Sequence, residues 1–516
     1  MQLAEKCLLE IGPTGAIWFD DVHRGNVMLD VRIHDKYQLE FKSHYRFKMQ
    51  EEHTSYALEI YMFVPNSLDL EHNNYPKYLF YRDLQTYLRF ETPRIALRHV
   101  VSGKRNPFQS LEECFQKLAA DSSSGNIRNY ENQLKMFCCV VRKALSEHIE
   151  FLDRKNDRKD IDYLVENYIL LTTDILKKFR DLRTAITIPT IDEKIFSIYV
   201  LIDEYLSLVT DEYSYRLLET LKKSGLENYD DHKSSILRLI TNEISYRKAK
   251  DYLTGPKEND NNEELVYRMQ SLRKYTESVL FLSTRAQQEG KLAQQMIFSA
   301  AAGLAMIWAT AIAIYTQYKF GIFTMAFFIT LVVSYIFKDR IKEIVRDYLS
   351  SKLLRFFYDQ KIRICTCSRK HQIGSSRESF SFVGDDKVDD EILKLRNRDS
   401  ISGTGEYTVG EKTILYRKKI NVSPAHFEQV YQALQVKGIA DITRYSLARM
   451  TRKMGYPKRH LFITDGKDYR RINARKVHHI NFIIRYTAHD ESYLKRFRVV
   501  MDRGGIRRLE EIEISS

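Results

Sequence analysis

The sequence has little glycine and little proline, with 20 and 9 residues of these types among 516. Enzymes often carry their catalytic residues on loops, and loops are rich in these two residue types. The sequence also has no glycine-rich phosphate-binding loop, no Gly-x-Ser-x-Gly elbow, no paired metal-ligand motif and no dinucleotide fingerprint. An enzyme is therefore the less favoured class, and we expect no catalytic residue, no metal and no cofactor.

Cysteine is scarce too, with six residues in the chain. They form two close pairs and two isolated positions: Cys138 with Cys139, Cys365 with Cys367, Cys7 and Cys114. This spacing is not that of a disulfide framework, and it fits a reducing, cytoplasmic setting.

Charge is absent from one part of the chain. Leu292–Tyr318 has 27 residues without a charge, and Phe320–Phe337 has 18 more after a short break. A helix needs about 20 apolar residues to cross a hydrocarbon core of about 30 Å, so the second run is barely long enough. The break is too short to hold a domain. The predicted fold class is therefore a multi-pass membrane protein with a two-helix transmembrane hairpin.

Lysine and arginine are unevenly distributed around this predicted hairpin. Arg285 and Lys291 precede it, and six basic residues follow within twenty positions: Lys338, Arg340, Lys342, Arg346, Lys352 and Arg355. The positive-inside rule then predicts that both termini are cytoplasmic. We expect an integral protein of the bacterial inner membrane.

The first charge-free run is rich in small residues. Ser299 and Gly303 are four positions apart, and a second series has the same spacing: Ala301, Ala305, Ala309 and Ala313. Small residues on one helix face allow helices to approach closely in membranes. Two alternatives are open: these residues pack against the second helix of the same chain, or they mediate oligomerisation.

The remaining chain changes its hydrophobic period from part to part. Strict alternation over Tyr37–Met49 and Tyr56–Val64 predicts antiparallel strands, whereas a helical period with few breaks follows. The last of these helices, from Glu263 onward, is expected to continue into the first apolar run. The predicted domains are a β-rich domain (1–105), a long-helix bundle or coiled-coil-like stack (106–290), the transmembrane hairpin (291–338), an amphipathic juxtamembrane helix (339–358) and a basic α+β domain (359–516).

Positive charge is concentrated after the hairpin. The whole chain carries +13, whereas residues 338–516 alone have 38 Lys+Arg and 23 Asp+Glu, a net charge of +15. Basic residues near an anionic leaflet contribute roughly 1 kcal/mol each. Contacts with anionic lipid or phosphate are predicted for two clusters: Lys338, Arg340, Lys342 and Arg346, and Arg470, Arg471, Arg475 and Lys476.

These patterns predict a membrane-anchored cytoplasmic binding, scaffolding or sensing protein. The expected partners are lipids of the anionic inner leaflet and either a protein partner or a second copy of the chain, with nucleic acid as a less favoured alternative. Two other functions stay open. One is a pore-type effector whose hairpin oligomerises under control of the soluble domains, and the other is a membrane-bound enzyme whose site is dispersed through the sequence.

Overall fold

A computed structural model describes the chain in fifteen ranges, and the structural statements below concern these residues: 28–46, 54–103, 106–154, 158–187, 192–224, 228–258, 260–289, 291–321, 324–353, 357–366, 372–397, 410–423, 436, 438–488 and 491–514. The chain divides into two compact units. Unit 1 comprises Met1–Thr86, Ser283–His426 and Asp441–Ser516, and unit 2 comprises Tyr87–Leu282 and Phe427–Ala440. Both units are therefore discontinuous in sequence.

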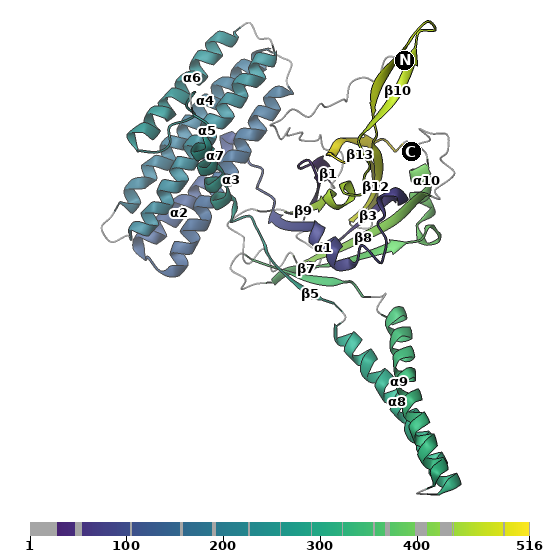
Figure 1. Cartoon of the computed structure of the whole chain (residues 1–516). Helices are drawn as coiled ribbons and strands as arrows, with labels where there is room; N and C mark the ends of the chain where they lie inside the picture. The colour runs from purple at the N-terminus through teal and green to yellow at the C-terminus, as the bar shows by residue number, and fades with distance from the viewer. Residues whose placement is uncertain are drawn as a thin grey trace. The chain divides into compact units, whose positions relative to one another are not determined.

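Unit 2 is a helical bundle (Figure 1). Its helices are α2 (Pro107–Ala120), α3 (Ser124–Asp153), α4 (Arg158–Asp181), α5 (Glu193–Ser224), α6 (Tyr229–Ala249) and α7 (Glu263–Glu277). Helix α5 is central, because it packs against α3, α4, α6 and α7. Every residue from Ile202 to Asp211 is buried. The charged side chains in this stretch must therefore find their partners inside the bundle, since burying an unpaired charge is very unfavourable.

Unit 1 is built on antiparallel sheets. The larger sheet has the strand order β14-β13-β12-β3-β8-β7-β6-β5. Its strands are β3 (Thr54–Pro65), β5 (Ser283–Gln288), β6 (Gln360–Cys365), β7 (Gln372–Val383), β8 (Glu411–Val422), β12 (His478–Ala488), β13 (Glu491–Asp502) and β14 (Gly505–Ile512). A four-stranded sheet has the order β1-β2-β9-β4, formed by Met28–Ile33, Gln38–Arg46, Gly438–Ser446 and Leu84–Phe90.

Aromatic side chains join β2 to the larger sheet. The Tyr45 ring lies 4.7 Å from that of Tyr56 on β3 and 5.6 Å from that of Tyr486 on β12, measured between centroids. The predicted alternation is confirmed here, because β2 lies within the run 37–49 and β3 contains the run 56–64. Both aromatic residues of β2, Phe41 and Tyr45, are therefore buried against β12 of the larger sheet.

Strand β3 lies in the middle of the larger sheet. It pairs with β12 on one side, Ile60 opposite Ile484, and with β8 on the other, Ile60 opposite Tyr416. The strand that the sequence places in an N-terminal β domain is thus surrounded by strands that come more than 300 residues later.

Helices α8 (Lys291–Phe320) and α9 (Met325–Leu353) form a helical hairpin that is inserted between two paired strands (Figure 1). Strand β5 leads into α8 and β6 follows α9, and the strands pair at Gln288 and Gln360. The two helices pack against each other. The prediction of one helix from Glu263 into the apolar run is wrong, because α7 ends at Glu277 and β5 intervenes.

The prediction of a two-helix transmembrane hairpin is also wrong. Helix α8 ends at Phe320, and the turn at Gly321 (φ 75°) delays α9 until Met325. The charge-free part of α9, Met325–Phe337, is therefore 13 residues or about 20 Å long, well below the hydrocarbon thickness of about 30 Å. The second charge-free run is not one continuous helix.

Among the described residues, one helix is long and apolar enough to cross a membrane, over Gln294–Lys319. One such helix is weak evidence for a span, because core helices and signal sequences pass the same test of length and composition. The expected multi-pass membrane protein is not supported. Nor is its placement in the bacterial inner membrane with two spans and both termini in the cytoplasm.

Candidate functional site

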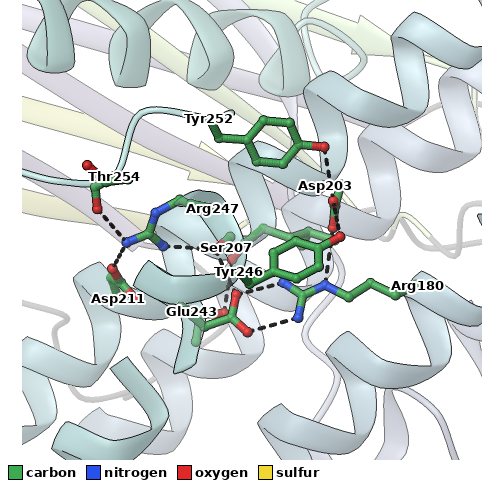
Figure 2. Close-up of polar contacts among 11 residues, drawn as sticks. Arg180, Asp203, Ser207, Asp211, Glu243, Tyr246, Arg247, Tyr252 and Thr254 are labelled. Atoms are coloured by element: carbon green, nitrogen blue, oxygen red, sulfur yellow. Dashed lines mark hydrogen bonds and ion pairs between the residues drawn. The ribbon is translucent and has the colours of Figure 1, made fainter. Parts of the chain in front are cut away.

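Unit 2 contains a buried polar network between α4, α5 and α6 (Figure 2). Asp203, Ser207 and Asp211 are spaced by four residues on α5, so they share one face of the helix. Tyr246 and Tyr252 donate to Asp203 Oδ2 at 2.7 and 3.2 Å. The regular spacing of these polar residues inside an apolar helix is the sequence signal for the network, and our sequence predictions did not include it.

Glu243 of α6 connects the three helices. Arg180 of α4 donates two parallel hydrogen bonds to it, from Nη1 to Oε1 at 2.9 Å and from Nη2 to Oε2 at 2.7 Å. Ser207 Oγ of α5 donates to the same Oε2 at 2.7 Å. The Arg180 guanidinium also stacks on the Tyr246 ring, 3.5 Å from its centroid. Such two-point pairing fixes the orientation of the helices.

Arg247 is the most buried cation of the network, with 1% of its surface exposed. Its Nη1 donates to Ser207 Oγ at 2.8 Å, and its Nη2 donates to Asp211 and, at 3.0 Å, to the Thr254 carbonyl (Figure 2). Burial raises the pKa of Asp211 to about 6, although Arg247 opposes the shift. Asp211 therefore changes its charge near pH 6 and not near 4.

This network lies away from solvent. Arg247, Asp203 and Ser207 are each at most 1% exposed, so their side chains are not positioned to meet a ligand from solution. Their hydrogen bonds connect α4, α5 and α6, although Asp211 Oδ1 and Arg247 Nε have no hydrogen-bond partner among the described residues. We therefore assign it to the stability of unit 2.

Unit 1 has a second buried ionic cluster, centred on Lys418 of β8. Lys418 is fully buried, and its Nζ lies 2.8 Å from Asp441 Oδ2 and 3.4 Å from Glu378 Oε1. Asp441 belongs to β9 of the four-stranded sheet and Glu378 to β7 of the larger sheet. Burial raises the pKa of Asp441, and Lys418 opposes that shift. The cluster joins the two sheets through charge.

Buried thiols are not candidate nucleophiles. Cys138 and Cys139 of α3 are both buried, and burial raises the pKa of Cys139 to about 12 and that of Cys138 well above its usual value. A thiol needs a lowered pKa to react at neutral pH. Among the described residues, no group of three or more His, Cys, Asp or Glu side chains is arranged to hold a metal ion.

The α8–α9 hairpin has the most extensive exposed apolar surface. Only 17% of the most apolar window of α8 is buried. Large apolar side chains are exposed along both helices: Met296, Leu304, Met306, Ile307, Ile314, Met325, Phe328, Ile329, Leu331, Val332, Val333, Ile336 and Phe337. Contiguous apolar patches of this kind on a protein mark sites of contact with a protein, a membrane or a ligand. The hairpin is therefore the main candidate functional site.

The small residues of α8 lie on two different faces. Ala301 and Ala305 are buried, 0% and 1% exposed, and Ala309 and Ala313 are partly buried. Ser299 and Gly303 are exposed, and a Cβ atom added to Gly303 would meet nothing within 4 Å. The alanine series thus lies in the packed part of the hairpin, whereas Ser299 and Gly303 face outward. Whether either series packs helices in a membrane stays a prediction.

Because Ala305 is buried and Gly303 is exposed, two matched substitutions at these positions should affect the packing of the hairpin differently. Ala305→Leu inserts bulk into a closed contact and should destabilise the hairpin by about 1–3 kcal/mol. Gly303→Leu meets open space and should leave the hairpin packing unchanged. The effect of each substitution can be measured as the rate of disulfide formation between cysteines placed at Trp308 and Phe337, whose rings lie 6.1 Å apart. Equal effects of the two substitutions would contradict the assignment of faces.

The eight predicted anion-contacting residues lie on two separate elements. Lys338, Arg340, Lys342 and Arg346 follow the charge-free part of α9. Two of them have carboxylate neighbours on the same helix, Arg340 with Glu343 at 3.3 Å and Arg346 with Asp347 at 3.1 Å. The other four residues are Arg470, Arg471, Arg475 and Lys476, and they lie on or directly after β11. The structure does not combine the two clusters into one site.

Strands β10 (Lys458–Thr464) and β11 (Tyr469–Arg475) form a separate two-stranded sheet, labelled β10 in Figure 1. All residues of both strands are exposed except Ala474, which is partly exposed. We call this element the basic ribbon, residues 458–476, because it has seven Lys or Arg and two Asp.

Comparison with known proteins gives no match: no protein family, no curated protein and no solved structure is similar to this chain. The functional interpretation therefore follows from the geometry of the chain itself.

Proposed function

We propose that this is a binding and scaffolding protein that attaches to lipid bilayers through the α8–α9 hairpin. The observation that carries the proposal is the apolar surface of the hairpin, of which little is covered by the rest of the chain. Exposed apolar area costs roughly 25 cal/mol per Å² relative to burial, so a surface of this extent favours an apolar environment strongly. The proposal concerns lipid contact, and it does not require two helices to cross the bilayer.

The end of the apolar surface of α9 has the chemistry of a membrane interface. Tyr335 is 58% exposed, and the Lys338 ammonium lies 3.8 Å from the centroid of its ring. Aromatic residues and lysines are enriched at the level of the lipid headgroups. Residues 338–355 then have six basic and three acidic side chains, which favours anionic lipid. We therefore place this segment at the headgroups of an anionic leaflet.

The place of the hairpin in the chain supports a scaffolding role. The hairpin is inserted between β5 and β6, which pair along six residues of each strand. The two ends of the insertion are therefore connected to adjacent strands of the unit 1 sheet. Lipid bound to the hairpin would hold unit 1 close to the bilayer surface.

Trp308 of α8 provides a native reporter for this proposal. The chain has two tryptophans, so a Trp18→Phe variant makes Trp308 the only one. We expect the full-length variant to bind vesicles of phosphatidylcholine with phosphatidylserine, and bromine-labelled acyl chains to quench the Trp308 emission. Emission that stays unquenched while the protein remains folded would overturn the proposal.

A four-residue variant tests the contribution of the headgroups. Changing Lys338, Arg340, Lys342 and Arg346 to Gln should weaken binding to phosphatidylserine vesicles at least tenfold, since each basic residue near the surface contributes roughly 1 kcal/mol. Binding to pure phosphatidylcholine should change little. Gel filtration in the absence of lipid is the control, because a hairpin that is covered by a second copy instead would give a stable oligomer and no quenching.

A further inference from the structure

The two faces of the basic ribbon differ in chemistry. Residues that pair across an antiparallel ladder share a face, and the face alternates along each strand. The pairs Lys458 with Arg475, His460 with Asn473, Phe462 with Arg471 and Thr464 with Tyr469 form the polar face. The pairs Arg459 with Ala474, Leu461 with Ile472 and Ile463 with Arg470 form the apolar face.

The polar face combines positive charge with aromatic rings and an amide. Phe462 and Tyr469 lie 5.9 Å apart between ring centroids, and His460 Nδ1 lies 2.6 Å from Asn473 Oδ1. Within the described residues, no carboxylate forms an ion pair with Lys458 or Arg471. Arg475 is partly compensated, because Asp502 Oδ2 lies 3.9 Å from its Nε. This face therefore offers uncompensated cations and side chains that stack or hydrogen-bond.

The turn at the tip of the ribbon contains Asp465 and Asp468 and is held together by its own hydrogen bonds. Asp465 Oδ1 accepts hydrogen bonds from the backbone N–H of Lys467 at 2.9 Å and of Asp468 at 2.8 Å. Gly466 takes a φ of 87°, which the turn requires. The hydrogen bonds from the backbone of Asp468 and Lys467 lower the pKa of Asp465, so the tip keeps its negative charge at neutral pH. A charged tip opposes insertion into lipid. We therefore expect a ligand to bind along the two strands of the ribbon and not at its tip.

We propose that the basic ribbon binds duplex DNA, with its polar face in the major groove. The major groove of B-form DNA is about 12 Å wide and admits a two-stranded β-ribbon, whereas the major groove of an RNA helix is too narrow. Seven residues per strand extend about 24 Å, the length of several base pairs. Lys458, Arg471 and Arg475 contact the phosphates, and Asn473 lies between them at the level of the bases.

The test measures the fluorescence anisotropy of a labelled 20-base-pair DNA duplex titrated with the full-length chain in a non-ionic detergent. We expect binding that weakens as salt rises, because each phosphate contact releases a counterion. Lys458→Ala with Arg471→Ala should weaken binding at least tenfold and reduce the slope of log K against log salt by about 2.

A matched variant removes the same charge from the opposite face. Arg459→Ala with Arg470→Ala should weaken binding by about threefold or less. Equal losses for both double variants would overturn the assignment of the binding face, and failure of the unaltered chain to bind at about 50 mM salt would overturn the proposal. All four side chains are exposed, and a melting curve for each variant verifies that folding is unchanged.

A second binding measurement, with lipid vesicles, distinguishes DNA from lipid as the anionic partner. If Lys458→Ala with Arg471→Ala weakens binding to phosphatidylserine vesicles and leaves DNA binding unchanged, the ribbon serves lipid and the DNA proposal is wrong. Quenching of Trp308 by labelled lipid does not depend on this result, so the proposed lipid contact of the hairpin stands or fails separately.

Discussion

Replacing Lys418 with Met should lower the free energy of unfolding of unit 1 by about 3–5 kcal/mol, the usual cost of removing one partner from a buried ion pair. Lys418 is fully buried, and Asp441 and Glu378 are each 1% exposed. Without the ammonium group, two carboxylates remain in the core with no cation beside them. The methionine side chain fills a similar volume, so the loss arises from charge and not from a cavity.

The loss should depend on pH. Burial raises the pKa of Asp441, and Lys418 normally opposes this shift. In the variant Lys418 no longer opposes the effect of burial, so the carboxyl binds a proton in the folded state at a pH where it is ionised in the unfolded chain. The contribution of this carboxyl to stability is therefore largest at low pH and decreases as the pH rises through its folded-state pKa. Adding Asp441→Asn should recover part of the loss at neutral pH.

Hydrogen–deuterium exchange followed by peptide mass spectrometry can measure this effect. Peptides from β7, β8 and β9 should exchange faster in the Lys418→Met variant, whereas peptides from α5 in unit 2 serve as an internal reference. Lys453→Met is the matched control, because Lys453 pairs with Asp69 at 2.9 Å but both side chains are more than half exposed. A Lys418→Met protein that is as stable as the control would show that the cluster contributes nothing to the fold.

Replacing Arg247 with Met should destabilise unit 2 by a similar amount, about 3–5 kcal/mol at pH 7.5. Arg247 is 1% exposed, and its removal leaves Asp211 without its cation and Ser207 without a donor. Arg180 cannot substitute, because both of its Nη atoms are already paired with Glu243. The destabilisation should appear as faster exchange in peptides of α5 and α6.

The pH dependence of this second effect follows from Asp211. Its pKa is about 6 in the folded chain and near 3.8 without the fold, so the folded state holds one more proton between these values. The contribution of Asp211 to the free energy of unfolding therefore falls as the pH rises from about 4 to about 6. In the Arg247→Met variant this fall should continue to higher pH, because the cation that favours the carboxylate is gone.

Two variants verify the assignment. Asp211→Asn should flatten the pH dependence between 4 and 6 and leave the stability at pH 7.5 closer to that of the unaltered chain than Arg247→Met does. Arg216→Met removes an arginine that pairs with Glu212 on the surface of the same helix, and it should have little effect. Unchanged pH dependence in Asp211→Asn would mean that another group titrates in this range.

Local patterns in the sequence were sufficient to predict many of the helices and strands. The alternation of Tyr37–Met49 and Tyr56–Val64 predicted β2 and β3, because side chains of a half-buried strand alternate between core and solvent. The helical period predicted the bundle of unit 2, because apolar side chains three or four positions apart lie on one face of a helix. The basic residues of α9 and the ribbon were also recognised in the sequence, since they are close together along the chain. The functions assigned to them stay proposals.

Contacts between residues far apart in the chain could not be predicted from local sequence patterns. Asp203, Ser207 and Asp211 have a visible spacing, but their partners Arg180, Glu243 and Arg247 lie on other helices. The ion pair of Lys418 with Asp441 likewise joins two sheets. A pair of residues far apart in the chain leaves no periodic signal in a single sequence, so only the fold reveals it.

The sequence by itself determined the hydrophobic period of each segment, the charge-free stretch of α8 and the excess of positive charge after residue 337. The tertiary structure decided that β3 lies between β12 and β8, that a strand separates the bundle from α8, and that α9 begins only at Met325. Composition counts residues along the chain without regard to where a helix ends. The turn at Gly321 therefore shortened the second apolar run below the thickness of a bilayer, although its composition suggested a second span.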